Sequence, residues 1–93
     1  MSDINEKPKI LVVEDELVAY ATISETLFMA GFMVERAENG KMALEILKNF
    51  RPAAVVLDRR MPVMDGNETL EAMKEDEKLK DIPVLILTGD DDV

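Results

Sequence analysis

The chain has 93 residues, which is enough for one folded domain and too short for two. It is 47% hydrophobic and 33% charged, as globular proteins are, and its net charge of −9 argues against nucleic-acid binding because no basic patch would neutralise phosphates. The absence of cysteine and histidine excludes a disulfide framework, a zinc finger and histidine-based acid–base catalysis, so any metal bound here must be a hard cation with oxygen ligands.

Residues 1–8 are polar and of mixed charge, which predicts a frayed leader rather than a signal peptide. No apolar run approaches membrane-spanning length, so we expect a cytoplasmic domain without a membrane anchor. From residue 9 onward, continuous apolar runs typical of strands alternate with segments whose apolar residues recur every three or four positions, as in helices. The predicted elements are a strand at 9–13, a helix ending near 30, an edge strand at 32–37, a helix closed by Pro52, a strand at 53–57, a helix at 67–75 and a strand at 82–87.

Strands that alternate with helices predict an α/β fold with a parallel sheet and right-handed crossover connections. Ligands of such sheets bind beyond the carboxyl ends of the strands. Three predicted strands end in oxygen-bearing side chains, at Glu14-Asp15, at Asp58 and at Thr88. We therefore expect these side chains to meet at one edge of the sheet.

Each of these acids has a simpler explanation when it is considered by itself. An acid after a strand often caps the next helix or interacts with the positive end of its dipole. Neighbouring strand ends lie about 5 Å apart, however, so Asp15 and Asp58 would face each other. Like charges at that range require a proton or a cation, and an oxygen cluster with room for water and phosphate suits Mg²⁺. We therefore predict a magnesium site.

The segment from Val55 to Gly66 carries the predicted chemistry. An apolar run stops at Asp58, and two arginines, a proline that cannot continue a strand and an Asp-Gly turn signal follow. This order is typical of a catalytic loop between a strand and a helix. We predict that Asp58 is a nucleophile for phosphoryl groups, whereas Asp65 makes the turn that starts the next helix.

Three motifs give the chain a specific resemblance. They are Ile10–Glu16, Asp58–Gly66 and Pro83–Gly89, and together they resemble the receiver domain of bacterial two-component response regulators. The resemblance implies a flavodoxin-like, doubly wound parallel sheet of strand order 2-1-3-4-5. It also implies that Asp58 accepts a phosphoryl group from the phosphohistidine of a sensor histidine kinase or phosphotransfer protein.

The resemblance further implies the composition of the site. Asp15 and Asp58 would bind Mg²⁺ directly, the Arg60 carbonyl would supply a third protein oxygen, and Glu14 would act through water. The Thr88 hydroxyl would bond a phosphoryl oxygen after transfer and so read the modified state. Such a domain catalyses its own phosphorylation and dephosphorylation but is not a turnover enzyme. The first acid is Glu14 where the family pattern has Asp, which keeps the charge.

The resemblance covers four strands and three helices. The family's lysine on a later strand and its aromatic switch residue have no counterpart within these 93 residues. Residues 1–93 are therefore expected to be a C-terminally incomplete receiver domain of strand order 2-1-3-4, without the fifth strand and the last helices. One sheet face would then be poorly covered, which predicts either that the missing chain exists in the native protein or that copies of this chain associate or swap elements to cover it. The alternative function is a structural module that is not competent for phosphorylation.

Three further interpretations concern the tuning of the site and its competing functions. Arg60 and Asp90 would form an ion pair that hinders the attacking water and slows dephosphorylation. A hydrolase of the aspartyl-phosphate type also uses a strand-end Asp, but it requires an acid two residues later, where this chain has Arg60. A flavin or nucleotide binder is disfavoured because no glycine-rich loop follows the first strand.

Overall fold

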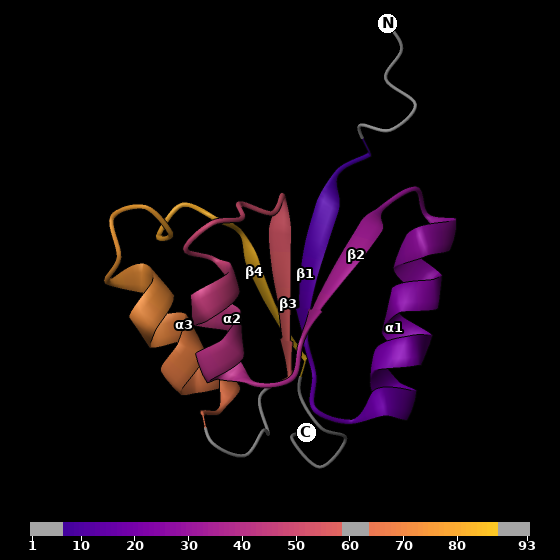
Figure 1. The fold of residues 1–93 in the computed structure, drawn as a ribbon, viewed down its shortest axis with the longest axis horizontal. Coiled ribbons are helices and arrows are strands. Elements are labelled where there is room, and N and C mark those ends of the chain that lie inside the picture. Colours follow the sequence, from indigo (N-terminus) through magenta and orange to yellow (C-terminus); the bar gives the residue numbers. More distant parts are fainter. Residues whose placement is uncertain (1–6, 59–63, 88–93) are drawn as a thin grey trace, which may run out of the picture.

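The fold is a four-stranded parallel sheet between two layers of helices (Figure 1). A computed structural model describes residues 7–58 and 64–87 of the chain. The strand order is β2-β1-β3-β4, which confirms the predicted order 2-1-3-4. The strands are β1 (Lys9–Val13), β2 (Met33–Ala37), β3 (Ala54–Asp58) and β4 (Val84–Leu87).

The three predicted helices are present, with shifted ends. They are α1 (Leu17–Met29), α2 (Gly40–Ile46) and α3 (Gly66–Lys74). The second helix ends earlier than the sequence pattern predicts, because Lys48 and Asn49 donate to carbonyls three residues back and tighten the last turn. Phe50 thus lies beyond the helix, although it still packs against the core. Among the described residues, no helix has the length and apolar character needed to cross a membrane.

The two faces of the sheet have separate cores. The larger core lies under α2 and α3 and is built around Leu11, Leu57 and Met73, all of which are fully buried. The smaller core lies under α1, where Tyr20 and Ile23 pack against Val12. Figure 1 shows this arrangement, with α1 on one side of the sheet and α2 and α3 on the other. It agrees with the right-handed crossovers expected for parallel strands.

The α1 face of the sheet is incompletely covered. A groove of about 220 Å³ lies between α1 and the last two strands. Ile23 and Leu27 of α1 form one wall, and Val56, Leu85 and Leu87 form the other. The Leu85 residue is 60% exposed, although every residue of its strand is apolar. We call this surface the apolar groove.

A close backbone approach fixes the start of α2 beside α3. The Gly40 amide donates to the Met64 carbonyl at 3.3 Å. A methyl group at Gly40 would lie 2.9 Å from that carbonyl oxygen and would overlap the Thr69 hydroxyl. Glycine is therefore the residue that allows this contact. The contact anchors Met64, where the segment that leads into α3 begins.

Candidate metal and phosphoacceptor site

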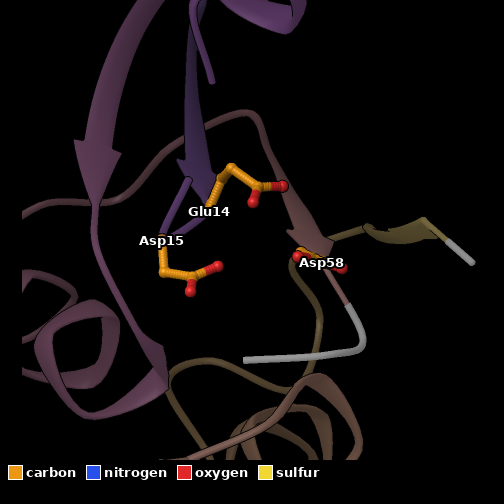
Figure 2. A group of neighbouring side chains, drawn as sticks. All are labelled: Glu14, Asp15 and Asp58. Atoms are coloured by element: carbon orange, nitrogen blue, oxygen red, sulfur yellow. The ribbon is translucent and has the colours of Figure 1, made fainter. Parts of the chain in front are cut away.

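Adjacent parallel strands bring three acids to one edge of the sheet. Glu14 and Asp15 directly follow β1, and Asp58 is the last residue of β3. β1 and β3 are neighbours, and Val13 pairs with Leu57, so the next residues of both strands emerge side by side. Carboxylate oxygens of the three acids lie within 4.8 Å of one another. Figure 2 shows the three side chains gathered at this strand edge.

Glu14 is the buried member of the group. It is 5% exposed, and its Oε2 accepts a hydrogen bond from the Glu16 amide at 3.1 Å. Its own amide donates to the Ala37 carbonyl of β2 at 3.0 Å. Burial, together with the charges of Asp58 and Asp15, raises the pKa of Glu14 to about 7, against the lowering effect of the Glu16 amide. The charged form of Glu14 is therefore disfavoured below about neutral pH unless a positive charge compensates it.

The donor set fits a hard divalent cation. The three side chains offer carboxylate oxygens and no nitrogen or sulfur, which suits Mg²⁺ and disfavours soft transition metals. Asp15 is exposed and Asp58 is half-buried, so the group opens to solvent on the side away from Glu14. A cation bound here would keep water ligands and would be within reach of a phosphoryl donor.

Arg36, near the end of β2, contacts the backbone of this site. Its Nη2 donates to the carbonyls of Glu14 at 3.2 Å and of Asp15 at 3.3 Å. The sequence alone does not indicate a role for Arg36, because the residue occupies an ordinary charged position of an edge strand. No local motif in the sequence indicates that its side chain reaches over β1 to the loop.

Asp65 has the structural role that the sequence predicts. Its side chain accepts from the Glu68 amide at 2.9 Å, and the Glu68 side chain accepts from the Asp65 amide at 3.0 Å. This reciprocal pair is a capping box at the start of α3. The Asp-x-x-Glu spacing is visible in the sequence and would have predicted it.

Three residues with predicted roles lie outside the described part of the chain. They are Arg60, Thr88 and Asp90. Their roles as carbonyl ligand, reader of the modified state and ion-pair partner therefore stay predictions.

Comparison with known proteins identifies the fold and the family. A family model described as the response regulator receiver domain matches residues 10–93. Response regulator MprA of Mycobacterium sp. (strain KMS) is 39% identical over 85 residues, which are 91% of this chain and 36% of that protein. The solved N-terminal domain of a response regulator receiver protein from Methanoculleus marisnigri JR1 is 41% identical, with a TM-score of 0.83, over 87% of this chain and 66% of that one. The signal receiver domain of a signal transduction histidine kinase from Syntrophus aciditrophicus is 33% identical, with a TM-score of 0.85, over 87% and 61%.

These matches agree with the sheet order and with the sequence motifs. The predicted flavodoxin-like fold and the predicted resemblance are both confirmed. The chain spans about a third of the length of the curated relatives, 36% in the case of MprA, so the activity of a whole protein is a matter for proposal. By fold, motif and similarity, this chain belongs to the response regulator receiver domain family of two-component signalling systems.

Proposed function

We propose that this domain is a phosphoacceptor module in which Asp58 receives a phosphoryl group, with Glu14, Asp15 and Asp58 forming a Mg²⁺ site. One observation carries the proposal: the oxygens of these three acids, which come from two adjacent strands, lie within 4.8 Å of one another. The raised pKa of Glu14, about 7, supports it, because burial and the neighbouring acids disfavour the charged carboxylate and a bound cation would stabilise it.

The residues of the chain have separate tasks in this reaction. An Asp58 oxygen attacks phosphorus, the bond from phosphorus to the donor nitrogen or oxygen breaks, and the product is an acyl phosphate on Asp58. The donor keeps the electron pair of the broken bond and takes up a proton. Asp15 and Glu14 supply the other carboxylates of the cation site at the strand edge. Mg²⁺, when bound, neutralises the negative charge of the transferring oxygens.

The remaining roles follow the family resemblance. The Arg60 carbonyl is the third protein oxygen of the cation site, and the Thr88 hydroxyl bonds a phosphoryl oxygen once Asp58 is modified. That hydrogen bond exists in one state and not in the other, so it supplies a switch. The phosphoryl donor is a sensor histidine kinase or a phosphotransfer protein, in keeping with the names of the relatives.

The direct test is labelling of the 93-residue chain by acetyl phosphate. We expect a mass increase of one phosphoryl group, labile to acid and to base as an acyl phosphate is, when Mg²⁺ is present, and a loss of labelling when EDTA replaces Mg²⁺. Intact-mass spectrometry measures both. Equal labelling with and without Mg²⁺ would remove the metal from the proposal. If the chain is not labelled under either condition, the second function, an associating module, is favoured.

The apolar groove favours a second function, an associating module. α1 carries a single charged residue, Glu25, in its thirteen positions. Val18 and Met29 of α1 are 72% and 78% exposed, and Leu85 is an exposed residue of the groove lining. Copies that each carry a charge of −9 repel one another, and this uncharged face is where they can approach. The occupant we propose for the groove is a second copy of this chain.

Charge placed in the groove should separate the copies. Sedimentation velocity over a concentration series should show a monomer–dimer equilibrium for the wild-type chain and a monomer for Leu85→Lys. Met33→Lys is the matched control: Met33 is also exposed, but it lies on β2 and outside the groove, so this variant should still dimerise. A wild-type chain that stays monomeric at high concentration would contradict the association. If Leu85 is buried in a longer form of the protein that stays monomeric, then another segment of the same chain fills the groove.

A further inference from the structure

Arg36 joins the end of β2 to the acid-bearing loop by its guanidinium group. The loop between β1 and α1 is the three residues Glu14, Asp15 and Glu16. One nitrogen of Arg36 donates to the carbonyls of the first two, at 3.2 and 3.3 Å. The Glu14 amide donates to the Ala37 carbonyl, next to Arg36 in the chain. The end of β2 therefore holds this short loop on both sides of the Glu14 residue.

The guanidinium itself is fixed in place. Its carbon lies 5.1 Å from the centre of the Tyr20 ring on α1, a distance typical of a cation–π contact. Its Nη1 lies 3.9 Å from the Glu38 carboxylate, and the side chain is 24% exposed. The planar fork is thus held between a helix, a strand end and the loop, which leaves it little freedom to move.

One feature of Arg36 has no explanation in the stability of the fold. Its Nε is buried and has no hydrogen-bond partner within residues 7–58 and 64–87. A buried donor without a partner destabilises a folded protein, so its presence calls for a compensating role. The two carbonyls that the same side chain binds belong to the residues that carry the site's carboxylates.

We propose that Arg36 is a positioning residue of the metal site, which holds the Glu14 and Asp15 backbone so that their carboxylates surround one cation position before the cation arrives. The inference rests on the proposed Mg²⁺ site. Groups that orient metal ligands contribute to affinity because the ordering of the loop is then complete before binding.

The sign of the effect separates positioning from simple charge. Arg36 is a cation near three acids, so if charge were its sole influence, a neutral substitution would make the site more negative and would tighten Mg²⁺ binding. Positioning predicts the opposite result. It also predicts a loss in Arg36→Lys, because an ammonium keeps the charge but lacks the planar fork that stacks on Tyr20 while it bridges two carbonyls.

The test is a titration with Mg²⁺ alone, followed by the amide NMR shifts of Glu14, Asp15 and Glu16. Arg36→Ala and Arg36→Lys should each raise the Mg²⁺ Kd about tenfold, in the range seen for groups that orient metal ligands. Arg51→Ala is the matched control. This substitution removes the same charge and a similar bond, from Arg51 Nη1 to the Lys78 carbonyl at 2.6 Å. Arg51, however, lies just before β3, at the end of that strand opposite to Asp58. The Kd of this variant should equal that of the wild type.

The possible failures can be told apart. A wild-type chain that shows no Mg²⁺-dependent shifts would overturn the proposed site, and this inference with it. If the wild type binds Mg²⁺ but Arg36→Lys has the same Kd, or Arg36→Ala binds more tightly, the positioning role alone would be overturned. The amide spectrum reports whether each variant is folded, and Arg36→Lys carries the test if Arg36→Ala is not.

Discussion

Asp58→Asn should abolish labelling of this chain by acetyl phosphate. The substitution replaces the attacking carboxylate oxygen with an amide that is a poor nucleophile, while the side chain keeps its size and its position at the end of β3. It also removes one of the three carboxylates that surround the proposed cation site. Intact-mass spectrometry after incubation with acetyl phosphate and Mg²⁺ measures the result, and we expect label at the background level.

Asp81→Asn is the control for this experiment. Asp81 is exposed, shortly before β4, and the substitution makes the same change of charge away from the strand edge that carries the acids. Its labelling should match that of the wild type. If Asp58→Asn is labelled as strongly as the wild type, then Asp58 is not the phosphoacceptor, and another acid of the group must be tested in its place.

Glu14→Gln should stabilise the metal-free domain above neutral pH. The folded protein holds the Glu14 proton up to a pKa of about 7, whereas the unfolded chain releases it near the ordinary value of 4.5. Between these values the folded state binds more protons, so the free energy of unfolding falls as pH rises through this window. Above a pH of about 7 the free energy of unfolding has lost the full contribution of this group. At about pH 8 the variant should be more stable than the wild type by about 1–2 kcal/mol, a figure reduced for the solvent around the open site.

Urea denaturation in EDTA at about pH 5 and about pH 8 measures this difference. At about pH 5 the wild type is largely protonated at Glu14 and should nearly match the variant. Glu25→Gln, an exposed acid on α1, is the control and should leave the pH dependence unchanged. Mg²⁺ should restore the wild type at about pH 8 because it neutralises the repelling charges. A wild type and a Glu14→Gln variant with parallel pH profiles would show that the burial of Glu14 has no energetic consequence.

The two experiments examine different properties of one site. The Asp58 substitution asks whether the group of acids performs phosphoryl chemistry, and the Glu14 substitution asks whether the same group carries an electrostatic penalty without a cation. Because the penalty arises from burial and from the neighbouring charges of Asp58 and Asp15, it should persist even in a chain that acetyl phosphate does not label. A site that binds Mg²⁺ but is not phosphorylated would thus be recognised as such.

The sequence by itself was sufficient for the order of the elements, the parallel sheet and the meeting of strand-end acids. Apolar runs with a polar end, such as Lys9–Val13 followed by Glu14, are local patterns that depend on backbone preference and burial. The sequence also indicated that Asp65 begins a helix, since a capping residue acts within one turn. It was less accurate at the end of α2, which ends at Ile46 with a tightened turn at Lys48 and Asn49, whereas the sequence pattern extends the helix toward Pro52.

The tertiary structure decided the features that join distant parts of the chain. The burial of Glu14, and with it the raised pKa, depends on packing around the end of β1 and on the charge of Asp58, 44 residues further along the sequence. The bond from Arg36 to the Glu14 carbonyl spans 22 residues. Neither leaves a local pattern, because burial and long-range hydrogen bonds arise from the register of neighbouring strands and not from the sequence around each residue. Local preferences therefore determined which acids reach the sheet edge, and strand pairing determined how they are held there.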